Sequence, residues 1–108
     1  MTTITYHAKC HDICIEGHAN SGPAGEDLIC CAVSTLAHTL QQTLEDFDID
    51  YALHSDETIP VIHIIGNPSD DIYQVVECTV AFQTVACGLR GLAANYPEYI
   101  TYNEYEGG

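Results

Sequence analysis

Residues 27–44 read DLICCAVSTLAHTLQQTL, and this stretch decides the fold class. Its apolar residues recur at the spacing of a helix with one buried face; they are Ile29, Val33, Leu36, Leu40 and Leu44. Asp27 predicts the start of this helix, because an acidic side chain near the N-cap accepts backbone N–H groups. Acidic residues between positions 45 and 48 predict its end, since they oppose the negative end of the helix dipole.

Strand patterns flank this helix on both sides. Residues 3–10 alternate between apolar and polar side chains, and residues 13–18 do the same after a short turn, which predicts a hairpin. After the helix, residues 50–54 and 60–65 predict two more strands. Residues 99–102 are expected to form a short strand at an edge of the sheet.

A second helix is predicted from about residue 70 to residue 94, after a break at residues 66–68. Its apolar residues should form a wide buried stripe that includes Ile72, Val76, Phe82, Ala86, Leu89 and Ala93. The order is therefore strand, strand, helix, strand, strand, helix. This order predicts an α+β fold, with a mostly antiparallel sheet and two helices packed on one face. A chain of 108 residues fits one domain, residues 1–108.

The charge is strongly unbalanced. Lys9 and Arg90 are the chain's two basic residues, and they oppose 16 acidic residues, which gives a formal net charge of −14. Such a surface repels phosphate, so we expect no nucleic-acid partner. It would attract basic partners, although the same charge could serve solubility alone.

The six cysteines are interpreted as free thiols. The first residues, Met1 to Tyr6, show no basic start and no apolar run, so we expect no secretory signal and a cytoplasmic location. Cys78 and Cys87 lie within the apolar pattern of the second helix and are predicted to be small core residues. No membrane association is expected, because no apolar run approaches the roughly 20 residues of a membrane span.

A histidine and a cysteine are predicted to form a catalytic pair. His18 lies in the run Gly17-His18-Ala19 at the end of the second strand, and Cys30 lies near the start of the first helix. A thiolate nucleophile needs a nearby proton acceptor and an environment that favours negative charge, such as the first turn of a helix. We therefore predict Cys30 as nucleophile and His18 as base. The residues alone also leave Cys31 open as the nucleophile.

Four further residues are assigned supporting roles. Asp27 could orient His18 or cap the helix, and we favour capping. Ser34 lies one turn after Cys30 on the same flank, where it could form a hydrogen bond near the site or allow close packing. Gly22 and Gly25 give backbone freedom to residues 19–26, which are predicted to form a lid over an extended peptide.

Two other classes of function are weighed against this one. A metal site could use Cys10, His11, Cys14 and His18, with His7 nearby, but the second distant ligand pair typical of zinc sites is missing. A non-catalytic acidic module that binds a basic partner would need no reactive thiol. We predict neither a metal nor a cofactor.

The residues around the predicted pair also carry a family resemblance. The pattern of Gly17-His18-Ala19, Gly25, Asp27, Cys30, Ala32 and Ser34 resembles the ribosomal-processing cysteine proteases called Prp. The resemblance extends over nearly the whole chain, including residues 95–100. The family histidine falls on His18 and the family cysteine on Cys30, while Cys31 stands where alanine is expected.

This resemblance implies an endopeptidase that removes a short N-terminal extension from a large-subunit ribosomal protein, and it implies a homodimer. The partner would be a basic N-terminal peptide of that ribosomal protein. The net charge of −14 is compatible with such a partner, because ribosomal proteins are basic.

Overall fold

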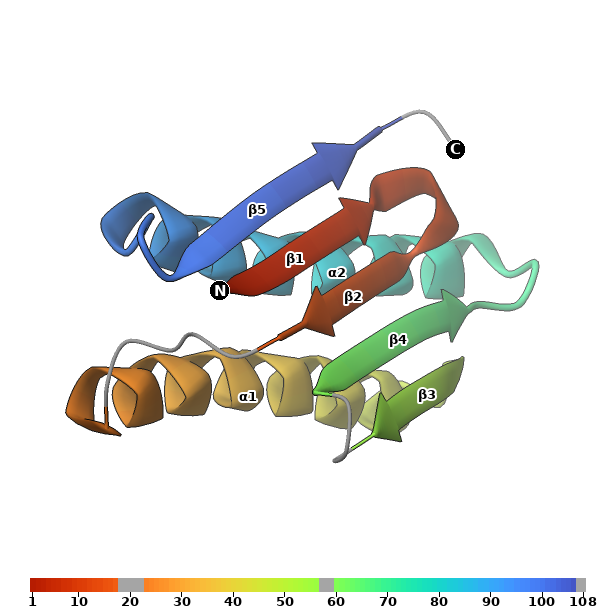
Figure 1. The fold of residues 1–108 in the computed structure, drawn as a ribbon. Coiled ribbons are helices and arrows are strands. Elements are labelled where there is room, and N and C mark those ends of the chain that lie inside the picture. Colours follow the sequence, from red (N-terminus) through yellow and green to blue (C-terminus); the bar gives the residue numbers. More distant parts are fainter. Residues whose placement is uncertain (18–22, 57–59, 107–108) are drawn as a thin grey trace.

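The computed structural model describes residues 1–17, 23–56 and 60–106, with residues 23–27 described by their backbone alone. Within these ranges the chain forms five strands, two long helices and one short 3₁₀ turn, η1 (Figure 1). In chain order the elements are β1 (Thr2–His7), η1 (Ala8–Cys10), β2 (Asp12–Glu16), α1 (Pro23–Asp46), β3 (Asp50–Asp56), β4 (Val61–Asn67), α2 (Ile72–Asn95) and β5 (Ile100–Tyr105).

The strands form one sheet in the order β3-β4-β2-β1-β5. Neighbouring strands are antiparallel except for β1 and β5, which are parallel. The predicted α+β fold and the edge strand near residues 99–102 are confirmed. The sheet is mixed because α2 carries the chain back across it before β5 begins, so β5 joins beside β1 and runs in the same direction.

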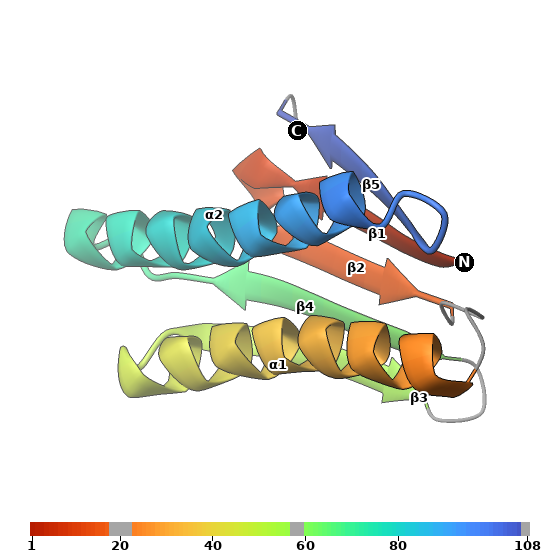
Figure 2. The ribbon, with the colours of Figure 1, turned by 90° about the vertical axis from the view of Figure 1, so that its left-hand side faces the viewer.

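Both helices cover the same face of the sheet (Figure 2). Strand side chains alternate between two faces. The face under the helices is apolar and buried, and it includes Ile4, Tyr6, Ile13, Ile15 and Ile64. On the other face Thr5 is paired across the strands with Cys14, and Cys14 with His63. No helix or strand of the described ranges covers this second face.

The first hairpin is shorter than residues 3–10 and 13–18 predict. The register pairs His7 with Asp12, which leaves four residues to reverse the chain. Three of them form η1, and His11 completes the reversal with a left-handed φ of 51°. The first strand therefore ends at His7, because the tight reversal uses the residues that continue the alternating pattern.

Helix α1 confirms the predicted core spacing but begins earlier than predicted. Of the five apolar residues at this spacing, four are buried and Leu36 packs against them partly buried. The helix begins at Pro23, four residues before Asp27. Proline suits the first helical position because that position has no intrahelical partner for an N–H group. The prediction of Asp27 as N-cap is therefore wrong, and Gly25 lies in the helix and not in a loop.

Helix α2 begins at its N-cap Asp71, whose side chain accepts a hydrogen bond from the Tyr73 N–H at 2.9 Å. Its buried face contains Phe82 and residues around it, but Ile72 is 71% and Val76 is 53% exposed. At 100° per residue, Val76 lies about 120° around the helix from Phe82. Cys87 lies about 140° away and is exposed. The predicted burial of Ile72, Val76 and Cys87 is therefore wrong.

By length and composition, α2 is also the one helix among the described residues that is apolar enough to cross a membrane. A core helix passes the same test. In this fold Cys78, Phe82 and Leu89 of α2 are completely buried against the rest of the protein. This packing accounts for the apolar residues on the buried face of α2, whereas other apolar residues of the helix, such as Ile72 and Val76, are exposed.

We predict that Gly66→Ala destabilises the fold. A Cβ atom at Gly66 of β4 would lie 2.8 Å from Cys78 Sγ and 2.8 Å from Phe82 Cε1 of α2. Such overpacking should lower the free energy of unfolding by about 1–3 kcal/mol, measured by urea denaturation. The matched control is Gly91→Ala in α2, where a Cβ meets nothing within 4 Å. This control should keep or gain stability, by up to about 1 kcal/mol. Equal stability of the two variants would contradict the prediction.

Candidate active site

A cavity of about 390 Å³ opens where four strand ends meet α1. The register brings these ends together, because Val61 at the start of β4 pairs with Glu16 at the end of β2 and Asp56 at the end of β3. β1 begins beside the end of β2. The lining residues are Thr2, Ile15, Gly17, Cys30, Val33, Ser34, Ser55, Asp56, Pro60, Val61 and Ile62.

Cys30 is half-buried, and its side chain packs against the hydrophobic core and lines the cavity. It is the eighth residue of α1, since the helix begins at Pro23. The predicted position in the first turn is therefore wrong. The unpaired N–H groups and most of the dipole effect belong to the first turn of a helix. A proton acceptor near Cys30 is correspondingly more important for forming its thiolate.

Cys31 lies on a different side of α1. It is exposed and does not line the cavity of Cys30. It contributes instead to a shallow surface along the outer flank of α1, together with residues such as His38 and Gln42. Adjacent helical residues are about 100° apart, so one of the two thiols faces the strand ends and the other faces away. The geometry therefore favours Cys30 over Cys31.

Gly17 follows β2 and lines the cavity. Its backbone is in the left-handed region, which glycine adopts readily. Its φ is +89°, and a Cβ atom there would lie 2.5 Å from the backbone oxygen of Met1. Its N–H donates to the Pro60 carbonyl at 2.8 Å, and the Thr2 hydroxyl donates to its carbonyl at 3.5 Å. Neighbouring strand ends thus hold the backbone that leads into residue 18.

Several predicted site residues lie outside the described residues. These are His18 and Gly22, together with the side chain of Asp27. The pairing of His18 with Cys30 stays a prediction. It is supported by the position of Gly17, the preceding residue, at the same cavity as Cys30.

Ser34 lines this cavity one helical turn after Cys30, together with two residues that the sequence did not single out. Ser55 and Asp56 end β3, and Asp56 places a carboxylate at the cavity. The predicted strand ended at residue 54. Asp56 reaches the cavity because it pairs with Val61. This pairing depends on the register of β3 and β4, so the local sequence around Asp56 does not indicate it.

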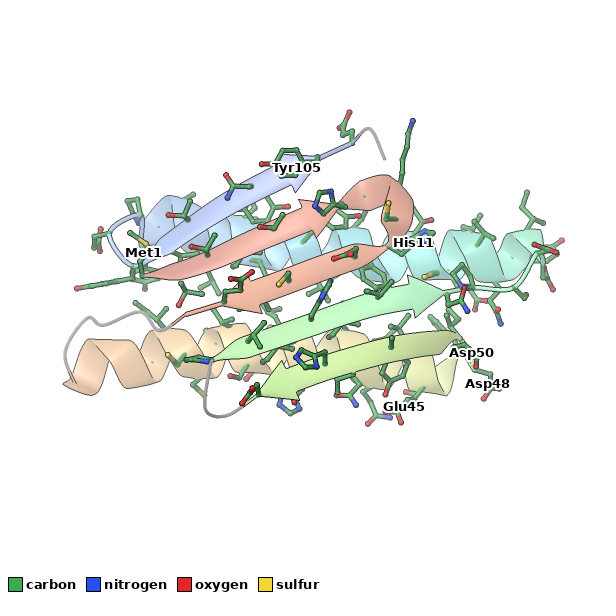
Figure 3. The ribbon with its side chains drawn as sticks, turned by 45° about the vertical axis from the view of Figure 1, so that its right-hand side comes forward. Met1, His11, Glu45, Asp48, Asp50 and Tyr105 are labelled. Carbon is green, nitrogen blue, oxygen red and sulfur yellow. The ribbon has the colours of Figure 1, made fainter. Side chains whose placement is uncertain are left out.

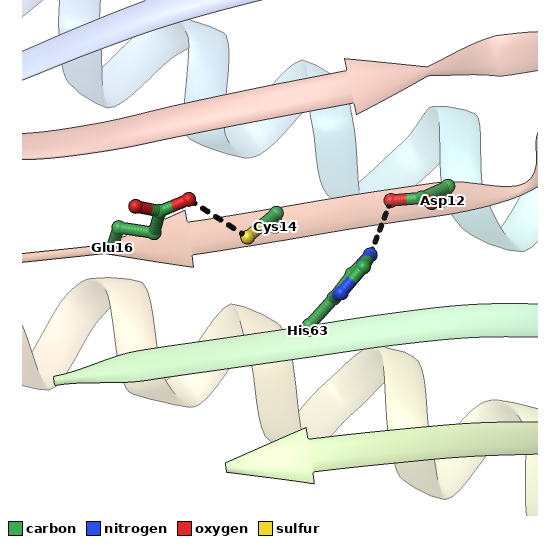
Figure 4. A network of polar contacts seen from close by, with 4 residues as sticks. All are labelled: Asp12, Cys14, Glu16 and His63. Atoms are coloured by element: carbon green, nitrogen blue, oxygen red, sulfur yellow. Dashed lines mark hydrogen bonds and ion pairs between the residues drawn. The ribbon is translucent and has the colours of Figure 1, made fainter. Parts of the chain in front are cut away.

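The uncovered face of the sheet carries a second group of polar residues (Figure 4). His63 Nε2 donates to Asp12 Oδ1 at 2.7 Å, and the Cys14 thiol donates to Glu16 Oε1 at 3.3 Å. Burial and the neighbouring carboxylate of Glu16 raise the pKa of Cys14 to about 11. Cys14 is therefore a protonated thiol at neutral pH and a poor nucleophile.

The predicted metal ligands do not converge among the described residues. Cys10 is exposed, Cys14 bonds to Glu16, and His11 Nε2 lies 2.9 Å from the Thr79 hydroxyl. In the described part of the chain, no three His, Cys, Asp or Glu side chains are arranged to hold a metal ion.

Comparison with protein families identifies the family of this chain. The model of the family described as cysteine protease Prp matches residues 1–101. The chain belongs to the Prp family of cysteine proteases. A comparison with curated proteins found no significant match. As a member of this family, the chain is a peptide-bond hydrolase with a cysteine nucleophile.

Solved structures share the Prp fold. The protein SMU.848 from Streptococcus mutans is 28% identical, with a TM-score of 0.78, over 97% of this chain and 92% of that chain. The Prp protease from S. aureus, described as an essential ribosomal-processing protease in complex with a covalently linked product peptide, is 21% identical. Its TM-score is 0.76, over 95% of this chain and 96% of that chain.

We predict that Gly17→Ala impairs both stability and catalysis. The positive φ and the contact with Met1 should lower the free energy of unfolding by about 1–3 kcal/mol. Relief of this strain would move the backbone that leads into His18, so peptide cleavage should fall even where the variant is fully folded. Urea denaturation and cleavage rates at low temperature measure the two effects. A folded variant with the parent's cleavage rate would show that Gly17 does not position the site.

Proposed function

We propose that this Prp-family protease removes a short N-terminal extension from a large-subunit ribosomal protein, with Cys30 as nucleophile and His18 as general base. The observation that carries the proposal is the cavity shared by Cys30 and Gly17, which the exposed Cys31 does not line. Family membership favours this reading over a non-catalytic binding module.

The reaction is a two-step acyl transfer. His18 takes the proton from Cys30 Sγ, and the thiolate attacks the carbonyl carbon of the scissile peptide bond. When the tetrahedral intermediate collapses, the C–N bond breaks, and His18 returns the proton to the leaving amine. Water, deprotonated by His18, then attacks the thioester, and the acid product leaves as the thiol re-forms. Every proton is accounted for by the dyad and water, so the proposed mechanism uses no cofactor.

The cavity walls suit an extended peptide. One side is α1 and the other is formed by the ends of strands, with apolar side chains such as Ile15, Val33 and Ile62 and a carboxylate from Asp56. The structures of the S. aureus relative carry a substrate peptide or a covalently linked product peptide. These complexes support the proposal that this chain acts on a peptide.

The negative charge is expected to act on the approach of the substrate. Glu45, Asp48 and Asp50 lie together around the end of α1 and the start of β3 (Figure 3). Glu45 stands fifteen positions after Cys30, which corresponds to about 22 Å along the helix. That distance exceeds the screening length of about 8 Å at physiological ionic strength. At physiological ionic strength these charges are therefore screened from the scissile bond. At low salt, where screening is weaker, they attract a basic protein at long range.

A cytoplasmic location and a homodimer belong to the same proposal. A ribosomal protein is made in the cytoplasm, and the free state of all six cysteines is compatible with that compartment. The proposal of a homodimer rests on the family resemblance alone.

Matched cysteine variants test the nucleophile. Cys30→Ala should abolish cleavage of a peptide that spans the extension and keep the fold, because Cys30 is only half-buried. Cys31→Ala should keep most of the activity, because its side chain is exposed. Cleavage is measured by mass spectrometry and folding by circular dichroism. An active Cys30→Ala with an inactive Cys31→Ala would reverse the assignment.

The same assay tests the base. His18→Ala should lower the cleavage rate by at least about a hundredfold, within the range of general acid–base groups. His38→Ala is the control, because His38 is an exposed residue on the flank of α1 that carries Cys31. If His18→Ala turned over substrate at the parent rate, the dyad would have to be abandoned.

Salt dependence tests the role of the charge. The association rate of a basic substrate peptide should fall as ionic strength rises, because added salt screens the −14 charge. A neutral analogue of the same peptide should show little change. Stopped-flow fluorescence measures both rates. The same salt response for both peptides would show that the charge serves solubility alone.

A further inference from the structure

A second cavity, of about 690 Å³, lies between the end of β1, η1, α2 and the end of β5. It shares no lining residue with the cavity of Cys30. Its volume is within the range of small-molecule sites. The proposed peptidase mechanism uses none of its residues.

Both basic residues of the chain line this second cavity. Lys9 contributes from η1 and Arg90 from α2, although 16 acidic residues are spread over the sequence. Arg90 Nη1 lies 3.5 Å from Glu104 Oε1, which also accepts a hydrogen bond from the Tyr102 hydroxyl at 2.6 Å. Among the described residues, Lys9 has no ion-pair partner. Arg90 Nη2 also donates to Cys87 Sγ at 3.4 Å, so the cavity holds an unpaired ammonium group and a guanidinium group with two long contacts.

A buried hydroxyl at the same cavity also lacks a partner. Tyr6 lines the cavity and is 2% exposed, and its hydroxyl makes no hydrogen bond within the described residues. Buried polar atoms are nearly always hydrogen-bonded, so an unpartnered one indicates a missing ligand or water. Burial and the nearby Glu104 raise the pKa of Tyr6, so its hydroxyl keeps its proton and can donate at neutral pH.

Acidic and apolar groups complete the walls. Glu104 and Glu106 approach from the end of β5, while Val75 and Ala86 of α2 add apolar surface. The cavity thus offers donors for an anion and acceptors for a cation. A net anion would be repelled by the overall charge of −14, whereas a ligand with one charge of each sign would not.

We propose that this cavity binds a small zwitterion that carries an α-carboxylate and an α-ammonium group. The carboxylate is bound by Lys9, Arg90 and the Tyr6 hydroxyl. The ammonium group faces Glu106 and Glu104, and the hydrocarbon part of the ligand lies against Ala86, one helical turn before Arg90. Free amino acids and short peptides share this chemistry, and a peptidase releases molecules of the second kind.

NMR titration of the full chain tests the proposal. The probes are leucine and the dipeptide alanyl-leucine, with N-acetyl-leucine, leucinamide and acetate as matched compounds that each lack one charge. We expect saturable shifts at residues 6, 9 and 90 with a dissociation constant of about 10 mM or lower for at least one zwitterion. Each matched compound should bind at least about tenfold more weakly, because one charge-assisted contact is lost. A preference for leucine or for alanyl-leucine identifies the source of the ligand.

Variants test the contacts one by one. Tyr6→Phe removes only a hydroxyl without a partner, so its melting temperature should stay the same or rise while affinity falls by about tenfold. Lys9→Gln alters an exposed residue and should weaken binding by a similar factor. If no zwitterion shifts these resonances at about 50 mM, or acetate binds as well as leucine, the proposal is wrong. Binding that is unchanged in both variants would overturn it as well.

Discussion

Burial of one face of the sheet under α1 and α2 is the constraint on which the rest of the structure depends. The alternation of side chains in β1 and β2 directs residues such as Ile4 and Ile13 toward the helices. The same alternation leaves Cys14 on the uncovered face, where it bonds to Glu16. A thiol beside Glu16 is held protonated, while the thiol of Cys30 lies on the helix side and lines the cavity at the strand ends.

The candidate active site is a consequence of where the strands stop. β2 and β3 end, and β1 and β4 begin, at one margin of the sheet, and α1 runs past that margin with Cys30 facing it. Gly17, which follows β2, is tied to the strand ends around it. Its N–H donates to the Pro60 carbonyl, and its carbonyl accepts from the Thr2 hydroxyl, which holds its left-handed backbone. Rigid strand ends thus hold the walls of this cavity more firmly than a free loop would.

Periodicity predicted most of the fold, because burial repeats every two residues in a strand and every three or four in a helix. It did not give the start of α1, since Pro23 can open a helix as well as interrupt one. It also failed for Val76, which is apolar but faces away from the sheet. At the site, the pattern around Cys30 could be found in the sequence. The contribution of Asp56 could not, because it depends on the register of β3 and β4.

The parallel pairing of β1 with β5 has a consequence for the order of events in folding. Thr2 pairs with Ile100, so two segments from distant parts of the chain form neighbouring strands. Contacts of such high sequence separation form slowly, because a large loop must close first. During synthesis β1 leaves the ribosome long before β5, and until β5 arrives the edge of β1 exposes unpaired backbone groups that can template aggregation. The hairpin of β1 and β2 can form at once, but the sheet reaches its final width only after α2 has been made.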